Sequence, residues 1–154
     1  MAGYLTLDEF KLRTAMPGGD VDVVELSEPG HVLAQLDDWS AEINDRLRKR
    51  YAVPFAHPEP RIILRWLTAI VTPSVYRKRG GNPNDPTLAL YEKDRADALA
   101  ELREAADAKD GLFELPLRED LPGSKAVTKG PMGSSEASPH TWTSVQAEAV
   151  NRGG

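Results

Sequence analysis

The segment from residue 60 to residue 71 constrains the fold more than any other, because apolar side chains would surround most of its circumference as a helix. Its polar edge consists of Arg61, Arg65 and Thr68. A helix that is apolar on most sides belongs at the centre of a bundle, so Trp66 and Ile70 are predicted core residues. Pro73 removes one backbone hydrogen bond and crowds the preceding turn. It therefore predicts a kink or a split before this helix ends near Gly80.

A short helix is predicted near the start of the chain. Thr6 and Glu9 have the spacing of a capping box, in which each side chain satisfies a backbone amide of the other residue. The helix should run to about Ala15. Its predicted buried side chains are Leu7, Phe10 and Leu12. Between this helix and Ser27 we expect a loop with a short turn of helix.

A longer helix is predicted from about residue 29 to residue 51. Ser27-Glu28-Pro29 supplies a capping hydroxyl, an acid and an early proline, which is typical of a helix start. Val53-Pro54 should stop the helix, because the residue before proline resists the helical region. The apolar stripe consists of Val32, Leu36, Trp39, Ile43 and Leu47. At about 100° per residue these positions share one face, so Trp39 and Ile43 are also predicted core residues.

A fourth helix should begin at Asp85 as the N-cap, with Pro86 at the first helical position, and should end before Gly111. Its apolar face consists of Leu88, Tyr91, Leu99, Leu102 and Ala106. The following segment, residues 112–117, is apolar and extended in pattern. Its proline, Pro116, bars it from a central strand.

The composition changes at Glu119, after which Gly, Ser, Pro and Thr dominate. Such a segment cannot offset its own ordering entropy. We therefore expect two parts: a helical domain over residues 1–118, and a flexible tail over residues 119–154 that orders on a partner. The predicted fold is all-α, a four-helix bundle-like domain with a kinked third helix and an extended C-terminal tail.

Charge is unevenly distributed along the chain. Residues 46–79 hold nine Lys or Arg and one acid, whereas residues 85–120 hold eleven acids and five bases. This segregation favours an oriented assembly or, alternatively, a basic helix pair that lies against an acidic helix. The candidate residues for inter-subunit or DNA-channel contacts are Arg46, Arg48, Lys49, Arg50, Arg77, Lys78 and Arg79. Cations also favour a helix C-terminus through its dipole, which is the simpler explanation of both clusters.

The sequence nominates no catalytic group, metal site or cofactor, and we expect a protein that is not an enzyme. His31, His57 and His140 lie in three separate segments without a ligand spacing. The glycine-rich turn at residues 80–85 lacks the lysine and the spacing of a phosphate-binding loop. Cys is absent, which excludes disulfides. No apolar run reaches the ~18 residues of a membrane span, and the first residues lack the pattern of a signal peptide.

Trp142 is the most informative residue of the predicted tail, because a large aromatic in a polar segment has no core of its own. It could pack loosely on its own domain, or it could fill a pocket on a partner, where aromatic residues supply much of the binding energy. The predicted partner-binding anchor consists of Trp142, Val145 and His140.

An ordered set of short segments resembles a family of small tailed-phage proteins, with a Mu-like phage and prophage branch. The segments are Tyr4-Leu5-Thr6-Leu7-Asp8-Glu9-Phe10, Leu47-Arg48-Lys49-Arg50-Tyr51, Val71-Thr72-Pro73, Tyr76-Arg77-Lys78-Arg79-Gly80 and Gly111-Leu112-Phe113-Glu114-Leu115-Pro116-Leu117. The ending Ser138-Pro139-His140-Thr141-Trp142 also resembles the family, although His140 and Trp142 stand in place of a basic residue and a Phe.

The family resembles head–tail connector (adaptor) proteins. The resemblance implies a virion protein, assembled in the host bacterial cytoplasm, that forms a ring of commonly twelve subunits beneath the portal vertex. Its implied partners are the portal protein, neighbouring copies of itself, a stopper or tail-completion protein, and double-stranded DNA that passes through the channel without sequence-specific binding. No membrane partner is expected.

Two other functions stay open at this point. One is a small nucleic-acid-binding regulatory protein that uses its basic helix ends, which salt-dependent binding of the free monomer to duplex DNA would favour. The other is an enzyme whose site one sequence cannot reveal.

Overall fold

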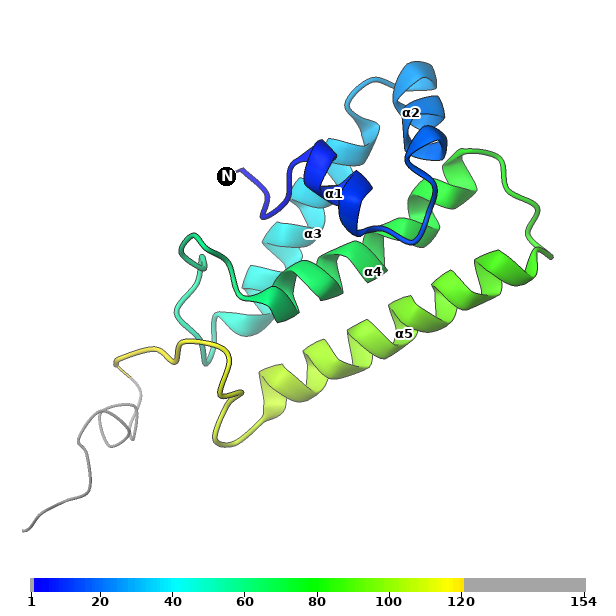
Figure 1. Cartoon of the computed structure of the whole chain (residues 1–154). Coiled ribbons are helices and arrows are strands. Elements are labelled where there is room, and N and C mark those ends of the chain that lie inside the picture. Colours follow the sequence, from blue (N-terminus) through cyan, green and yellow to red (C-terminus); the bar gives the residue numbers. More distant parts are fainter. Residues whose placement is uncertain (1, 121–154) are drawn as a thin grey trace, which may run out of the picture. The chain divides into compact units, whose positions relative to one another are not determined.

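The computed structural model describes residues 2–120, and this part of the chain forms five helices and no strand (Figure 1). The helices are α1 (Leu7–Arg13), α2 (Gly18–Ser27), α3 (His31–Leu47), α4 (Arg61–Lys78) and α5 (Pro86–Asp107). The predicted all-α class is confirmed. The number of helices in the described part is five and not four, because the segment expected to be mostly loop contains α2.

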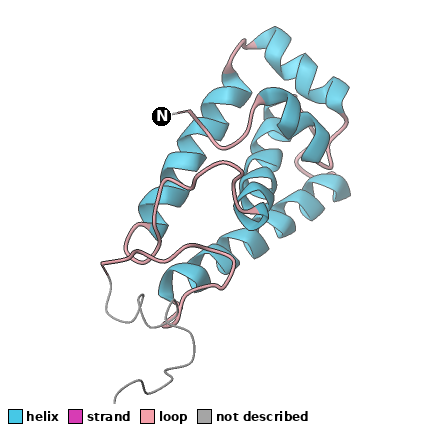
Figure 2. Ribbon diagram, turned by 60° about the vertical axis from the view of Figure 1, so that its left-hand side comes forward, coloured by secondary structure: helices cyan, strands magenta, loops and turns pink. Residues whose placement is uncertain are grey.

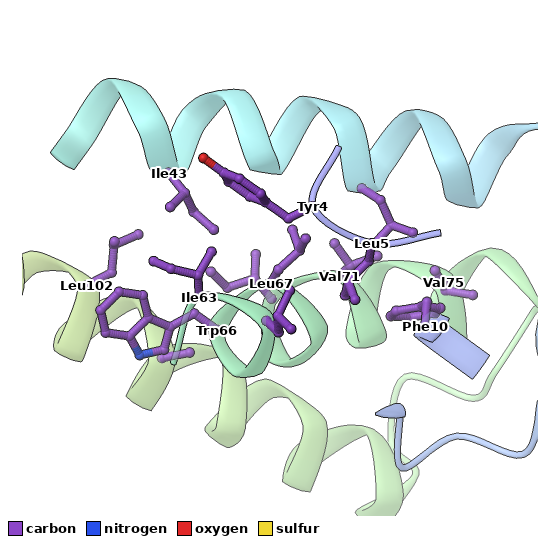
Figure 3. Close-up of a cluster of buried hydrophobic side chains, with 14 of the residues drawn as sticks. Tyr4, Leu5, Phe10, Ile43, Ile63, Trp66, Leu67, Val71, Val75 and Leu102 are labelled. Carbon is purple, nitrogen blue, oxygen red and sulfur yellow. The ribbon is translucent and has the colours of Figure 1, made fainter. Parts of the chain in front are cut away.

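Helix α4 lies at the centre of the domain and contacts each of the other four helices. Figure 3 shows its side chains between α3 on one side and α5 on the other. Trp66 is 1% exposed and Ile70 is fully buried. Ile43 of α3 is also fully buried, whereas Trp39 is only partly buried and stacks under the guanidinium of Arg95 at 5.5 Å.

Pro73 does not split α4, which is continuous from Arg61 to Lys78. Pro73 is buried within the helix, and the packing around it outweighs the single missing amide. The Thr72 hydroxyl donates to the Thr68 carbonyl at 2.7 Å, and the Thr68 hydroxyl donates to the Leu64 carbonyl at 2.8 Å. Thr68 is buried, so its assignment to the polar edge of the helix was wrong.

The start of α3 differs from its prediction. Ser27 ends α2, and its hydroxyl donates to the Val24 carbonyl and does not cap α3. Helix α3 begins after Gly30, which adopts a left-handed φ of 83°. The Glu25 carboxylate accepts from the backbone amides of Gly30 and Val32, each at 2.8 Å. A side chain from the preceding helix thus supplies the cap.

The first helix keeps the predicted capping box, with both reciprocal bonds between Thr6 and Glu9 present. Phe10 is fully buried, but Leu12 is 87% exposed. The prediction for Leu12 was wrong because α1 is a short helix that packs one narrow face, and Leu12 lies on the other side.

Helix α5 begins as predicted: the Asp85 carboxylate accepts from the Thr87 amide at 2.9 Å, and Pro86 is the first helical residue. Its buried residues are Leu88, Tyr91, Ala98, Leu102 and Ala105. Helices α4 and α5 form an antiparallel hairpin along their length (Figures 1 and 2). The α4–α5 pair is the most extensive helix–helix contact of the domain.

Tyr51 ties the chain after α5 back to the end of α3. Its hydroxyl donates to the Ala105 carbonyl at 2.7 Å and accepts from the Leu112 amide at 2.9 Å. Residue 51 also forms an isolated antiparallel bridge with Leu117. The extended segment 112–117 is thus held by single hydrogen bonds and by the buried side chain of Leu115, and it forms no sheet with the described residues. The chain divides into two units at this point, Met1–Arg118 and Glu119–Gly154.

Candidate functional site

The three cations at the end of α4 each contact an acid in a different segment of the same chain. The pairs are Arg77 with Glu92 in α5, Lys78 with Glu28 before α3 at 2.6 Å, and Arg79 with Asp20 in α2 at 3.0 Å. These cationic side chains are 39–55% exposed, so the pairs lie at the surface. Surface pairs contribute little stability, but they neutralise much of the charge of this cluster.

The basic cluster at the end of α3 is also engaged within the chain. Arg46 contacts Glu42 at 2.7 Å, Arg48 contacts Asp45 at 2.9 Å, and the Arg50 guanidinium donates to the Lys109 carbonyl. Lys49 is exposed. In each of the first two pairs the partners are about one helical turn apart in sequence, which is the usual spacing of helix-surface pairs.

The charge segregation is used at least in part inside the subunit. Arg65 and Arg77 of α4 contact Glu101 and Glu92 of α5 in the same chain. Of the two interpretations of the charge pattern, the geometry favours a basic helix that lies against an acidic one. Fewer charged side chains are therefore available than the sequence suggested for a contact between the basic region of one subunit and α5 of the next.

A hydrogen bond between Tyr76 and Asp85 joins the end of α4 to the start of α5. The bond raises the pKa of Tyr76 and lowers the pKa of Asp85, whose carboxylate also accepts from the Thr87 amide. The hydrogen bond from Lys78 similarly lowers the pKa of Glu28. These groups fix turns between helices, and the Asp85 carboxylate occupies the helix start that a phosphate would need.

The described histidines do not meet. The Nδ1 atom of His31 lies 3.3 Å from a carboxylate oxygen of Glu28, and the Nδ1 atom of His57 lies 2.9 Å from a carboxylate oxygen of Glu59. His140 lies outside the described residues, as do Trp142 and Val145. Within residues 2–120, no group of three or more His, Cys, Asp or Glu side chains is placed to hold a metal ion.

A groove runs along one side of the α4–α5 hairpin. A hollow of about 310 Å³ is lined by Arg13, Ala15, Leu64, Arg65, Thr68, Ala69, Thr72, Tyr91 and Asp94. A second hollow of about 330 Å³ is lined by Arg65, Trp66, Ala69, Asp94, Asp97, Ala98 and Glu101. The two share Arg65, Ala69 and Asp94, so they form one surface, which we name the α4–α5 groove.

The α4–α5 groove combines apolar walls with hydrogen-bonding groups. The hydroxyls of Thr14 and Thr72 are 2.8 Å apart, which joins the end of α1 to α4. Because position 73 is a proline, the carbonyl of Ala69 does not receive the usual amide hydrogen from four residues later. The Asp94 carboxylate lines both hollows and adds hydrogen-bond acceptors to the groove.

Several apolar side chains are exposed on other elements. They are Leu12, Val23, Leu26, Leu33, Leu90 and Phe113. Single exposed apolar residues are normal on protein surfaces. They indicate surface available for contacts, but unlike the groove they define no shape that one partner would fill.

One family described as Bacteriophage Mu, Gp36 matches the chain over residues 11–128. The chain belongs to this family. The match agrees with the Mu-like phage part of the resemblance seen in the sequence, and it contains every residue of the α4–α5 groove. It ends before His140, Trp142 and Val145.

Two further observations concern this member of the Mu Gp36 family. No curated protein and no solved structure matches the chain. None of the described helices combines the length and the apolar character needed to cross a membrane.

Sequence reasoning missed the groove. Thr68 was assigned to the outer edge of its helix, and Thr72 and Asp94 were given no role. One signal was available: two threonines four residues apart, next to a proline, inside an otherwise apolar helix. In such a pattern the threonine hydroxyls donate to helix carbonyls, and the proline leaves one carbonyl without its amide donor.

Proposed function

We propose that this phage protein is a structural head–tail connector, which forms an oligomeric ring under the portal vertex and links the DNA-filled head to the neck and tail. The observation that carries the proposal is the match to the Mu Gp36 family over residues 11–128. The motif order that resembles connector proteins falls largely within the same range.

The shape and the lining of the α4–α5 groove support an assembly part. The α4–α5 groove lies between helices, and its charged lining residues are Arg13 of α1, Arg65 of α4, and Asp94, Asp97 and Glu101 of α5. Its mixture of apolar and polar groups fits a peptide segment.

In the proposed ring, double-stranded DNA passes through the channel without sequence-specific binding. A channel that lets DNA move should not hold many phosphates strongly, because each neutralised phosphate adds to affinity. The cations of both basic clusters fit this requirement, since most of them already contact acids or carbonyl groups of their own chain.

The proposed partners are the portal protein, neighbouring copies of the chain, and a stopper or tail-completion protein. The proposed ring has twelve subunits and is part of the virion, after assembly in the host bacterial cytoplasm. Residues 119–154, with the anchor Trp142, Val145 and His140, would hold the ring in its place.

Electron microscopy of the purified protein, with and without portal protein, tests the proposal. We expect a closed ring that stacks coaxially on the portal. A monomer that ignores the portal but binds duplex DNA with a steep salt dependence would contradict it and would favour the nucleic-acid-binding regulator.

A deletion of residues 120–154 and the single change Trp142→Ala test the proposed anchor. Both proteins should remain folded, because the core of the described domain lies within residues 4–115, but both should lose stable association with portal-bearing heads. Normal association of both variants would show that these residues are not the anchor.

A further inference from the structure

The α4–α5 groove has the size of a site for side chains. Its first hollow, about 310 Å³, lies at the lower end of ligand pockets, which span roughly 300–1,000 Å³. One aromatic side chain and a neighbour would fit this hollow. The second hollow continues the surface along α4 and α5, so a short helix or an extended peptide could follow it.

The chemistry of the groove favours an aromatic residue with a hydrogen-bond donor. Leu64, Ala69 and Tyr91 supply apolar surface. The Asp94 carboxylate, which lines both hollows, supplies hydrogen-bond acceptors. An indole pairs a large apolar body with one N–H donor, so a tryptophan would use both features without displacing a helical hydrogen bond.

The chain itself contains a segment with matching properties. Trp142, Val145 and Ala149 are spaced by three and four residues, which is the pattern of a helix that lays one face into a groove. Glu148 and Arg152 carry one charge of each sign. The groove likewise offers both signs, with Arg13 and Arg65 as cations and Asp94, Asp97 and Glu101 as anions.

We propose that the α4–α5 groove of one subunit binds residues 142–152 of a second copy of this chain, with Trp142 in the hollow beside Ala69. The inference rests on the proposed function, because an unlike pair of surfaces, groove and C-terminal segment, is the heterologous contact that closes a ring. It assigns the groove and names the partner that the C-terminal anchor finds.

The chain has enough length for the contact. Residues 121–138 contain repeated Gly, Ser and Pro and precede the anchor. A Gly- and Ser-rich linker of about this length has a root-mean-square span of roughly 20–25 Å, from about 5–6 Å times the square root of its residue number. This span is comparable to the width of one small helical domain, so the anchor reaches an adjacent subunit.

Photo-crosslinking tests the contact in the full-length protein. Trp142 is replaced by p-benzoylphenylalanine, and chains grown in ¹⁴N and ¹⁵N medium are mixed in equal amounts in denaturant and refolded together before irradiation. We expect crosslinks to residues 64–72 and 91–94, with heavy–light pairs as abundant as same-isotope pairs. Same-isotope pairs alone would place the segment on its own chain, and crosslinks elsewhere or none at all would equally overturn the inference.

Two matched variants locate the site. Ala69→Arg fills the groove and should lower the crosslink yield by about tenfold, the change that a loss of roughly 1.4 kcal/mol in affinity produces. Ala100→Arg places the same side chain on an exposed position of α5 that does not line the groove, and should leave the yield unchanged. If Ala69→Arg proves unfolded by circular dichroism, Asp94→Arg at the exposed rim replaces it. Equal yields in the groove variant and the control would overturn the inference.

The crosslinking result and the microscopy result can fail separately. Rings on the portal without groove crosslinks would overturn this inference and leave the connector proposal intact. Groove crosslinks between copies without any association with the portal would support the inference and contradict the connector proposal.

Discussion

Helices α4 and α5 lie against each other along their whole length, yet their sequences meet this contact in different ways. Helix α4 buries eleven of its 18 residues, whereas α5 buries five of its 22. Helix α4 is surrounded by protein, so its position is stabilised by apolar burial on most sides. Helix α5 buries one narrow apolar stripe, and the rest of its surface faces outward.

The difference shows where each helix can tolerate change. Helix α4 accommodates an internal proline and two buried threonines because many contacts hold it. Helix α5 depends more on the bonds at its ends: Asp85 and Tyr76 at its start, and Tyr51 near its finish. We therefore expect side-chain truncation to be costly in α4, and loss of a terminal hydrogen bond to matter more in α5.

The largest effect should come from Trp66→Ala. The change removes a fully enclosed ring and the indole hydrogen bond to Glu101 at 2.8 Å. It should lower the free energy of unfolding by about 3–5 kcal/mol, measured by urea denaturation. The control, Leu90→Ala on the exposed face of α5, should stay within about 0.5 kcal/mol. A Trp66→Ala protein that melts within a degree or two of the parent would place α4 outside the core.

A smaller loss is expected for Tyr51→Phe. The variant keeps the buried ring but removes the hydroxyl between the Ala105 carbonyl and the Leu112 amide. Leaving buried polar groups unpaired costs about 1–3 kcal/mol. Hydrogen exchange should increase at Leu112 and in the last turn of α5, while α4 keeps its protection. Equal acceleration in both helices would contradict the proposed dependence of α5 on its end.

The pH dependence of stability should change in Asp85→Asn. The pKa of Asp85 is lowered in the folded state by the Tyr76 hydroxyl and then by the Thr87 amide. A lowered folded pKa contributes stability above the unfolded pKa, and this contribution is lost as the pH falls through the folded pKa. An asparagine at this position cannot titrate, so the variant should lose less melting temperature than the parent as the pH falls from neutrality to below the ordinary pKa of an aspartate. Asp38→Asn, an exposed position on α3, serves as the control.

The smallest effect should come from the surface pair Arg77–Glu92 between the two helices. A double-mutant cycle with Arg77→Ala and Glu92→Ala should give a coupling free energy of roughly 0–1 kcal/mol, because exposed pairs contribute little. High salt should reduce it further. A coupling above about 2 kcal/mol, well outside the range of exposed pairs, would show that charge and not burial holds α5 to α4.

Local signals in the sequence were sufficient for the helix starts that use their own side chains. The capping box at Thr6 and the Asp85-Pro86 pair both act as predicted. Helix α2 was not recognised because it begins at Gly18-Gly19 without a side-chain cap. Its stability comes from tertiary contacts: Val21 and Val24 are buried, and Asp20 contacts Arg79 from the far end of α4. No local pattern contains such information.

The candidate site was harder to predict for the same reason. The α4–α5 groove combines Arg13 at the end of α1, Thr72 in α4 and Asp94 in α5, and only packing brings these three together. The apolar stripe of α3 predicted Ile43 correctly as buried, but Trp39 lies at the edge of the stripe and is partly covered by Arg95. A stripe fixes the centre of a buried face better than its borders.

The attachment of segment 112–117 also determines how a mechanical load enters the domain. A pull on the chain beyond residue 118 would load the bonds from the Arg118 amide to the Arg50 carbonyl and from the Arg118 guanidinium to the Arg48 carbonyl. It would next load the bond from the Ala52 amide to the Pro116 carbonyl. The Tyr51 hydroxyl at the Leu112 amide comes third. Tension applied at this point would pass into the end of α3 through these hydrogen bonds in succession. The α4–α5 pair would bear tension only after these bonds, the Arg50 bond to the Lys109 carbonyl and the packing of the buried Leu115 side chain had yielded.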